Sequence, residues 1–144
     1  HCDKSYNDAL FDPLTRPLTT ENLNVAINHK CAPIYFEKHE KFGYSARAQR
    51  LIRKNSFICE YVGVIKPLEK ANNECDSIFD LFDMGFHVNK LLIDPSEKSN
   101  EGKNIQGSKS SQKGNIGSLR VSINNENRIL LYAKKDIKQN QHLN

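Results

Sequence analysis

Short apolar runs separated by polar turns recur along the chain, a pattern typical of a protein built from many short strands. The runs are rich in β-branched and aromatic residues, which favour strands, and few segments favour a helix. We predict strands at residues 34–36, 57–62, 64–65, 78–82 and 91–93. The pattern therefore indicates a mainly β fold with few short helices.

The C-terminal third contains the clearest alternation. Leu119, Val121 and Ile123 alternate with polar residues, and a polar turn at residues 124–127 separates them from a second apolar run at 128–133. These two runs predict a β-hairpin over residues 118–133. A shorter turn is expected at residues 43–45.

Two segments contain few apolar residues. Residues 1–31 are polar, and we interpret them as a flanking segment beside a main domain at residues 32–144. Residues 96–114 are rich in Ser, Lys, Asn and Gly. Such a segment buries too little apolar surface to offset the entropy of ordering it, so we predict a flexible insertion there.

Length and composition favour a single domain without a membrane span or a cysteine-rich metal site. The chain has 144 residues, enough for one domain, and no apolar run approaches the roughly 20 residues that span a bilayer, so no membrane partner is expected. Its four cysteines include no C-x-x-C pair, so we expect reduced thiols, no metal and Cys59 as a small buried hydrophobe. The formal charge is +4, which is compatible with a solvated basic surface or with weak attraction to nucleic acid.

Five sequence pieces, in one order, resemble the SET-domain family of protein-lysine methyltransferases over about residues 32–143. They correspond to the family's K-x-G-[WF]-G turn, F-I-x-E-Y-x-G strand, I-D strand end, G-N-I and R-I-x-x-[YF]-A-x-[RK]-D-I hairpin strand. In this chain the pieces lie at residues 37–48, 52–63, 93–94, 114–116 and 127–137.

The resemblance implies a SET fold, several small sheets around a knot-like core, with two opposed openings. One opening admits S-adenosylmethionine (SAM) and the other the substrate lysine. It also implies histone-lysine N-methylation in the nucleus, with a histone tail peptide as the substrate. We expect a monomer and leave open whether nucleosomal DNA is a second partner. Because the transfer is in line, holding the reacting groups collinear is the chief catalytic device.

Candidate site residues follow from the same resemblance. Phe42, Gly43, Tyr44 and Ser45 match the turn that lies against SAM, although the family usually has glycine where Ser45 stands. Tyr61 matches the tyrosine that lines the lysine channel. Taken alone, the first group is an ordinary surface turn and Tyr61 a core tyrosine. A local acidic stretch is expected to favour a basic peptide; its candidates are Glu60, Glu74, Asp76, Asp80 and Asp83.

Two family elements are missing from the sequence. The family continues from G-N-I into R-F-I-N-H-S-C-x-P-N, whereas here Ile116 precedes Gly117 directly, and the catalytic-tyrosine motif would follow Asn144. We expect further residues between Ile116 and Gly117 in the natural protein. The alternatives are a catalytically inactive SET-like module that binds a peptide by strand addition, and a basic nucleic-acid binder.

Overall fold

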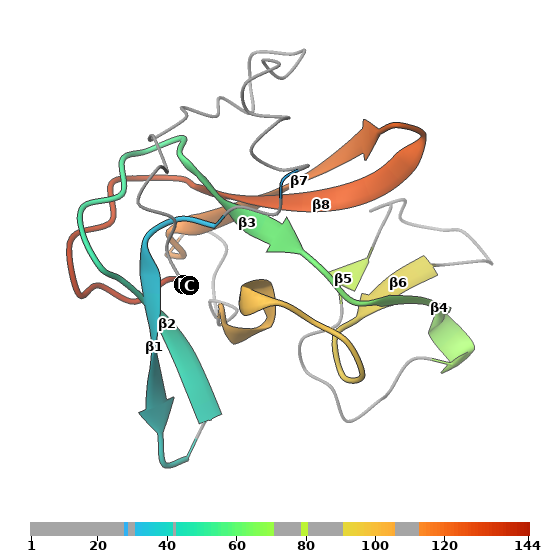
Figure 1. Ribbon diagram of the computed structural model, residues 1–144, viewed down its shortest axis with the longest axis horizontal. Helices are drawn as coiled ribbons and strands as arrows, with labels where there is room; N and C mark the ends of the chain where they lie inside the picture. Colours follow the sequence, from blue (N-terminus) through green and yellow to red (C-terminus); the bar gives the residue numbers. More distant parts are fainter. Residues whose placement is uncertain (1–27, 29–30, 42, 71–78, 81–90, 106–112) are drawn as a thin grey trace.

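Three small antiparallel sheets surround one core in the computed structural model, which describes residues 28, 31–41, 43–70, 79–80, 91–105 and 113–144 (Figure 1). The strands and short 3₁₀ helices are β1 (Ile34–His39), β2 (Gly43–Ala48), β3 (Phe57–Tyr61), β4 (Val64–Pro67), η1 (Leu68–Lys70), β5 (Phe79–Asp80), β6 (Leu91–Asp94), η2 (Glu101–Asn104), β7 (Ile116–Ile123) and β8 (Glu126–Ala133). The prediction of a mainly β fold is confirmed.

The sheet β3-β8-β7 forms the spine of the domain. Every residue of β3 is buried, and β8 buries Ile129, Leu130 and Leu131 between its two neighbours. The predicted hairpin over residues 118–133 is confirmed, and β7 begins two residues earlier than expected.

Strand β7 runs through the point where the sequence predicts further residues. Ile116 pairs with Ala133 and Gly117 pairs with Tyr132, and the same register continues without a break to the turn. The presence of further residues between Ile116 and Gly117 in the natural protein stays a prediction.

The β1–β2 hairpin lies beside this spine and extends away from it (Figure 1). Residues 43–45 begin β2, so the expected turn at these residues is replaced by a strand. Gly43 opens the strand at φ +75°, a conformation that glycine adopts without strain, and pairs with His39.

The third sheet, β4-β6-β5, depends on a close approach of two backbones. A Cβ built on Gly63 would lie 2.6 Å from the carbonyl oxygen of Asp94, so only glycine lets β4 approach the end of β6. The Asp94 carboxylate is fully buried and accepts hydrogen bonds from the Ser96 amide at 2.9 Å and from Lys66 Nζ at 3.3 Å.

The C-terminal residues pack back into the core beneath β2. Leu143 is buried, and its amide donates to the carbonyl of Ala46 at 3.0 Å. Buried Asn115 donates from Nδ2 to the His142 carbonyl at 2.6 Å, and its Oδ1 accepts from the Asn144 amide at 2.9 Å. The Gly-Asn-Ile piece at residues 114–116 thus anchors the end of the chain.

Residues 96–105 differ from the predicted flexible insertion. Asn100 caps η2, and its Nδ2 donates to the carbonyl of Glu60 at 2.7 Å, which attaches the helix to β3. Gly102 is buried against β3. Composition did not indicate that residues 96–105 are ordered. The segment is held largely by the Asn100 cap and by the buried Gly102, and a count of apolar residues detects neither. Residues 106–112 of the predicted insertion lie outside the described residues, as do most of residues 1–31.

Candidate functional site

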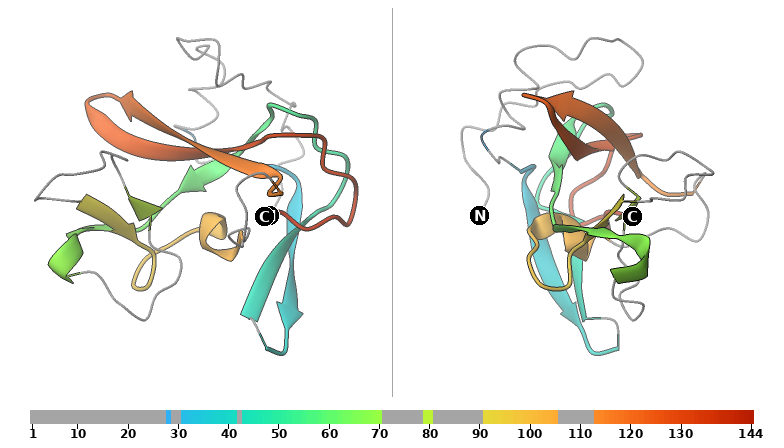
Figure 2. Two further views of the ribbon diagram at one scale, coloured as in Figure 1. Left: turned by 180° about the vertical axis from the view of Figure 1, so that it is seen from behind. Right: turned by 90° about the vertical axis from the view of Figure 1, so that its right-hand side faces the viewer.

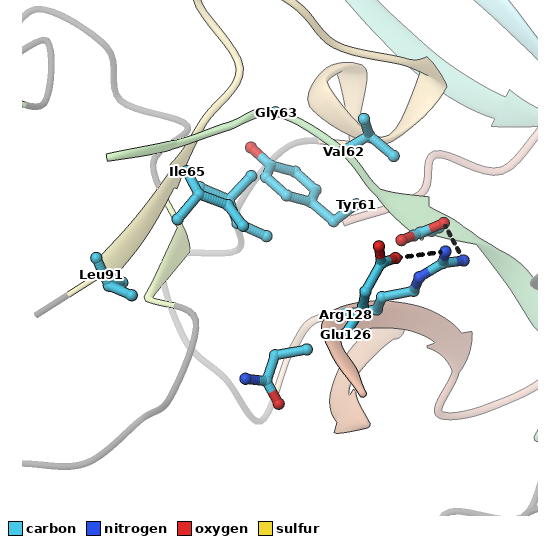
Figure 3. A pocket seen from close by; sticks show the side chains of 10 residues that line it. Tyr61, Val62, Gly63, Ile65, Leu91, Glu126 and Arg128 are labelled. Carbon is cyan, nitrogen blue, oxygen red and sulfur yellow. Dashed lines mark hydrogen bonds and ion pairs between the residues drawn. The ribbon is translucent and has the colours of Figure 1, made fainter. Parts of the chain in front are cut away.

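A pocket of about 450 Å³ opens between the end of β3, the β4–β6 pair and the β7–β8 turn (Figure 3). Tyr61, Val62, Gly63, Ile65, Leu91 and Ile93 form its apolar wall. Glu60, Glu126, Asn127 and Arg128 supply its polar side. The site therefore combines an aromatic and aliphatic surface with charged groups, which suits a ligand with an apolar stem and a polar head.

Tyr61 ends β3 and is 5% exposed. Its ring extends along the pocket, with the phenol oxygen pointing away from Arg128 (Figure 3). On its other side, a Cβ built on Gly102 would lie 3.2 Å from Tyr61 Cδ2. The ring is thus held between η2 and the pocket, and its role in lining a lysine channel stays a prediction.

Arg128 links two carboxylates at the polar side of the pocket. Its guanidinium donates to Glu126 at 3.0 Å and lies 3.7 Å from a carboxylate oxygen of Glu60 (Figure 3). The side chain of Glu60 is 10% exposed, whereas that of Glu126 is 69% exposed. Because Arg128 pairs with both carboxylates, the three groups together carry a formal charge of −1, and Glu126 is the more exposed of the two acids.

The predicted acidic stretch is represented here by a different set of residues. Glu60 lies at the pocket as expected, and Glu126 joins it from the β7–β8 turn. Asp80 lies in β5, on the same sheet as β6. Glu74, Asp76 and Asp83 lie outside the described residues.

The predicted SAM-binding residues lie on another part of the molecule. Gly43, Tyr44 and Ser45 begin β2 and do not line the pocket that contains Tyr61. A Cβ at Gly43 would meet nothing within 4 Å, and Tyr44 is 55% exposed, so both present open surface. Ser45 is buried, and its side chain therefore packs inward instead of crowding the turn. Phe42 lies outside the described residues.

Cys59 is a buried core residue, as predicted. Burial raises the pKa of its thiol, and nearby Cys31 and Glu101 raise it further, so the thiol stays protonated. Within the described ranges, no three His, Cys, Asp or Glu side chains are grouped to hold a metal ion, and no helix is long and apolar enough to cross a membrane.

Sequence reasoning missed several residues around this site, among them Asn100, Gly102 and Arg128. Gly102 and Asn100 lay in a segment dismissed for its polarity, and Arg128 was noted only as part of a family motif. The Asn100-Glu101 pair is a helix-capping signal that could have located η2. Nothing local to the sequence indicates that Arg128 reaches Glu60, because their contact depends on the pairing of β3 with β8.

Comparison with known proteins identifies the fold. The SET domain family model matches residues 43–144, and this chain belongs to the SET-domain family. The chain is 31% identical over 120 residues to the histone-lysine N-methyltransferase ATXR5 of Arabidopsis thaliana, covering 79% of this chain and 32% of that protein. It is 30% identical over 123 residues to ATXR6 of the same plant, covering 79% and 35%.

A solved structure agrees with these relatives. The ATXR5 SET domain in complex with di-methylated histone H3 superposes with a TM-score of 0.66 at 26% identity, covering 79% of this chain and 56% of that one. The prediction of a SET fold is confirmed. The chain spans about a third of the length of the curated relatives that it matches.

Proposed function

We propose that this chain is the SET domain of a SAM-dependent histone-lysine N-methyltransferase that acts in the nucleus. Its membership of the SET family and its similarity to two histone-lysine N-methyltransferases support the reaction. A related SET domain solved with histone H3 supports a histone tail as the substrate. The observation that carries the proposal is the position of Tyr61, the family's channel tyrosine, in the wall of a largely apolar pocket.

The pocket suits a lysine side chain. Lysine has a long aliphatic stem, which Ile65, Leu91 and Ile93 can cover. Its amine must lose a proton before it can attack, and its ordinary pKa is about 10.4. An apolar wall disfavours the ammonium form and lowers that pKa, which increases the fraction of neutral nucleophile.

The charges around the pocket suit a basic peptide. Glu126 is exposed at the rim and can attract cationic residues that flank the target lysine. Glu60 lies deeper, and Arg128 pairs with both carboxylates, so the three groups together carry a formal charge of −1. That residual negative charge can attract a basic peptide to the pocket.

We assign cofactor binding to the start of β2. The exposed Tyr44 ring and the open edge of Gly43 can contact SAM, while buried Ser45 would contribute through its backbone. SAM, when bound, supplies an activated methyl group on a sulfonium. The proposed task of this chain's residues is to hold the lysine amine in line with that group.

Incubation of the chain with methyl-labelled SAM and a panel of histone tail peptides tests the proposal. Label on a lysine Nζ, located by mass spectrometry and lost when that lysine is replaced by arginine, is the expected result. Calorimetry with SAM alone separates an enzyme from an inactive peptide-binding module. An absence of both cofactor binding and label would overturn the proposal.

A further inference from the structure

Two segments distant in sequence run side by side at the end of the molecule opposite the pocket. They are residues 49–55, which precede β3, and residues 133–141, which follow β8 (Figures 1 and 2). Ile52 and Ile137 exchange backbone hydrogen bonds of 2.9 and 2.8 Å, and both are fully buried. The Asn55 amide donates to the Ala133 carbonyl at 2.7 Å, so the backbones of both segments are fixed together.

This fixed pair of segments concentrates the positive charge of the chain. The cationic side chains on it, together with the adjoining Lys113, whose carbonyl accepts from Lys135 Nζ at 3.2 Å, are Arg50, Arg53, Lys54, Lys113, Lys134, Lys135 and Lys138. We call them the basic face. All are exposed except Lys134, which is half-buried.

Asp136 is the single carboxylate on these segments, and its Oδ1 accepts from the Lys54 amide at 2.8 Å. Seven cations against this one carboxylate give the basic face a formal charge of +6, whereas the entire chain carries +4. The remaining residues therefore sum to −2. The net charge of +4 is therefore unevenly distributed: the basic face carries +6, and it lies at the end of the molecule away from the pocket that contains Tyr61.

We propose that the basic face binds the phosphate backbone of duplex DNA. Arg and Lys side chains on a fixed frame suit a regular array of phosphates, and binding gains free energy from counterion release. Apolar anchors typical of protein interfaces are nearly lacking here, because Leu51 is the one exposed large apolar side chain on the two segments. Binding of duplex DNA does not depend on the proposed function. Only the statement that this DNA is chromatin rests on it.

The arrangement gives the two charged regions different tasks. The acidic rim of the pocket takes a basic tail, while the opposite face takes the polyanion from which a histone tail emerges. The basic face would therefore strengthen attachment to nucleosomal substrate without touching the reacting groups.

Fluorescence anisotropy with a short random-sequence duplex measures the binding across a salt series. The test variant combines R53Q, K54Q, K135Q and K138Q. Its matched control combines K38Q, K41Q, K70Q and K98Q, which remove equal charge from exposed positions elsewhere. We expect the test variant to lose at least tenfold in affinity, with a salt slope lower by about 3.6, because each of the four phosphate contacts contributes roughly 0.9. The control should lose less than threefold.

Equal losses in both variants would overturn the inference, since they would reflect total charge alone. Tighter binding of polyglutamate, of anionic phospholipid vesicles or of single-stranded DNA than of the duplex would also overturn it. Thermal unfolding of both variants checks that the exposed substitutions leave the fold intact.

Methylation assays separate this inference from the proposed function. The test variant should methylate a free histone peptide at the wild-type rate and a nucleosome at least fivefold more slowly. If the wild-type chain methylates no histone substrate, the proposed function fails while the anisotropy result still decides the DNA inference.

Discussion

Gly102 of η2 lies directly against the ring of Tyr61: a Cβ built on this glycine would stand 3.2 Å from Tyr61 Cδ2. The same Cβ would lie 3.3 Å from the carbonyl oxygen of Glu60, which Asn100 also engages. The close packing of η2 against Tyr61 therefore fixes the position of this ring in the pocket.

Replacing Gly102 by alanine should displace that ring by a few tenths of an ångström. We expect G102A to lower the free energy of unfolding by about 1 kcal/mol, at the low end for overpacking, and to slow methyl transfer by a larger factor. Single-turnover kinetics and urea denaturation measure the two effects. K103A, exposed on the same helix, is the control and should change neither.

In the β7–β8 hairpin, the Tyr132 ring lies so close to Gly117 that no larger residue fits there. A Cβ at Gly117 would stand 2.5 Å from Tyr132 Cζ and 2.7 Å from its hydroxyl oxygen. We expect G117A to destabilise the chain by about 2 kcal/mol, because a half-buried ring must move. Y132A should relieve most of that cost, and a double-mutant cycle measures the coupling. Simple additivity of the two changes would contradict this explanation.

Asn115 connects the start of β7 with the C-terminal residues. Its Nδ2 and Oδ1 satisfy the His142 carbonyl and the Asn144 amide, respectively. N115A should therefore cost about 2 kcal/mol in urea denaturation, since it leaves buried polar groups without partners. S118A, in the adjoining strand β7, provides a comparison. A loss no greater than that of S118A would show that these hydrogen bonds contribute little.

Lys66 provides a prediction on pH. The hydrogen bond to Glu97 raises the pKa of Lys66, and the hydrogen bond and charge of Asp94 raise it further, although partial desolvation opposes them. A raised pKa in the folded state stabilises the fold below the unfolded value near 10.4, and this contribution disappears as the pH rises through the folded value.

The urea midpoint of the wild type should accordingly exceed that of E97Q by a constant amount from about pH 7 to about pH 10. The difference should shrink at higher pH, as Lys66 loses its proton. A difference that stays constant through the alkaline range would contradict the assignment.

Local patterns predicted strands such as β3 and β6 well because these strands bury a compact run of apolar residues. The β7–β8 hairpin is the clearest case, since alternating Leu119 and Val121 face one side and the polar residues 124–127 form the turn. Residues 43–45 were expected to form a turn because they contain glycine and serine. They form a strand instead because they pair with β1, and local propensity contains no information about pairing with another strand.

The site was only partly predictable. Tyr61 could be singled out because its neighbours match a family motif, and the structure places it in the wall of a pocket. Gly102 meets the Tyr61 ring and Arg128 meets Glu60 through contacts between residues far apart in sequence, which no local pattern encodes. The Gly114–Ile116 motif matches the family, but a short motif does not say that Asn115 anchors residues 142–144.

The central claim is that the pocket beside Tyr61 receives the substrate lysine, and replacement of the phenol tests it most directly. Y61F keeps the ring and removes only the hydroxyl that would orient the amine. Y35F is the matched control, because Tyr35 donates to Asn140 on the surface at 3.2 Å, away from the pocket. We predict that Y61F transfers labelled methyl to a histone peptide at least tenfold more slowly than the wild type, with unchanged SAM binding, while Y35F retains full activity. Equal transfer by Y61F and Y35F would contradict the claim.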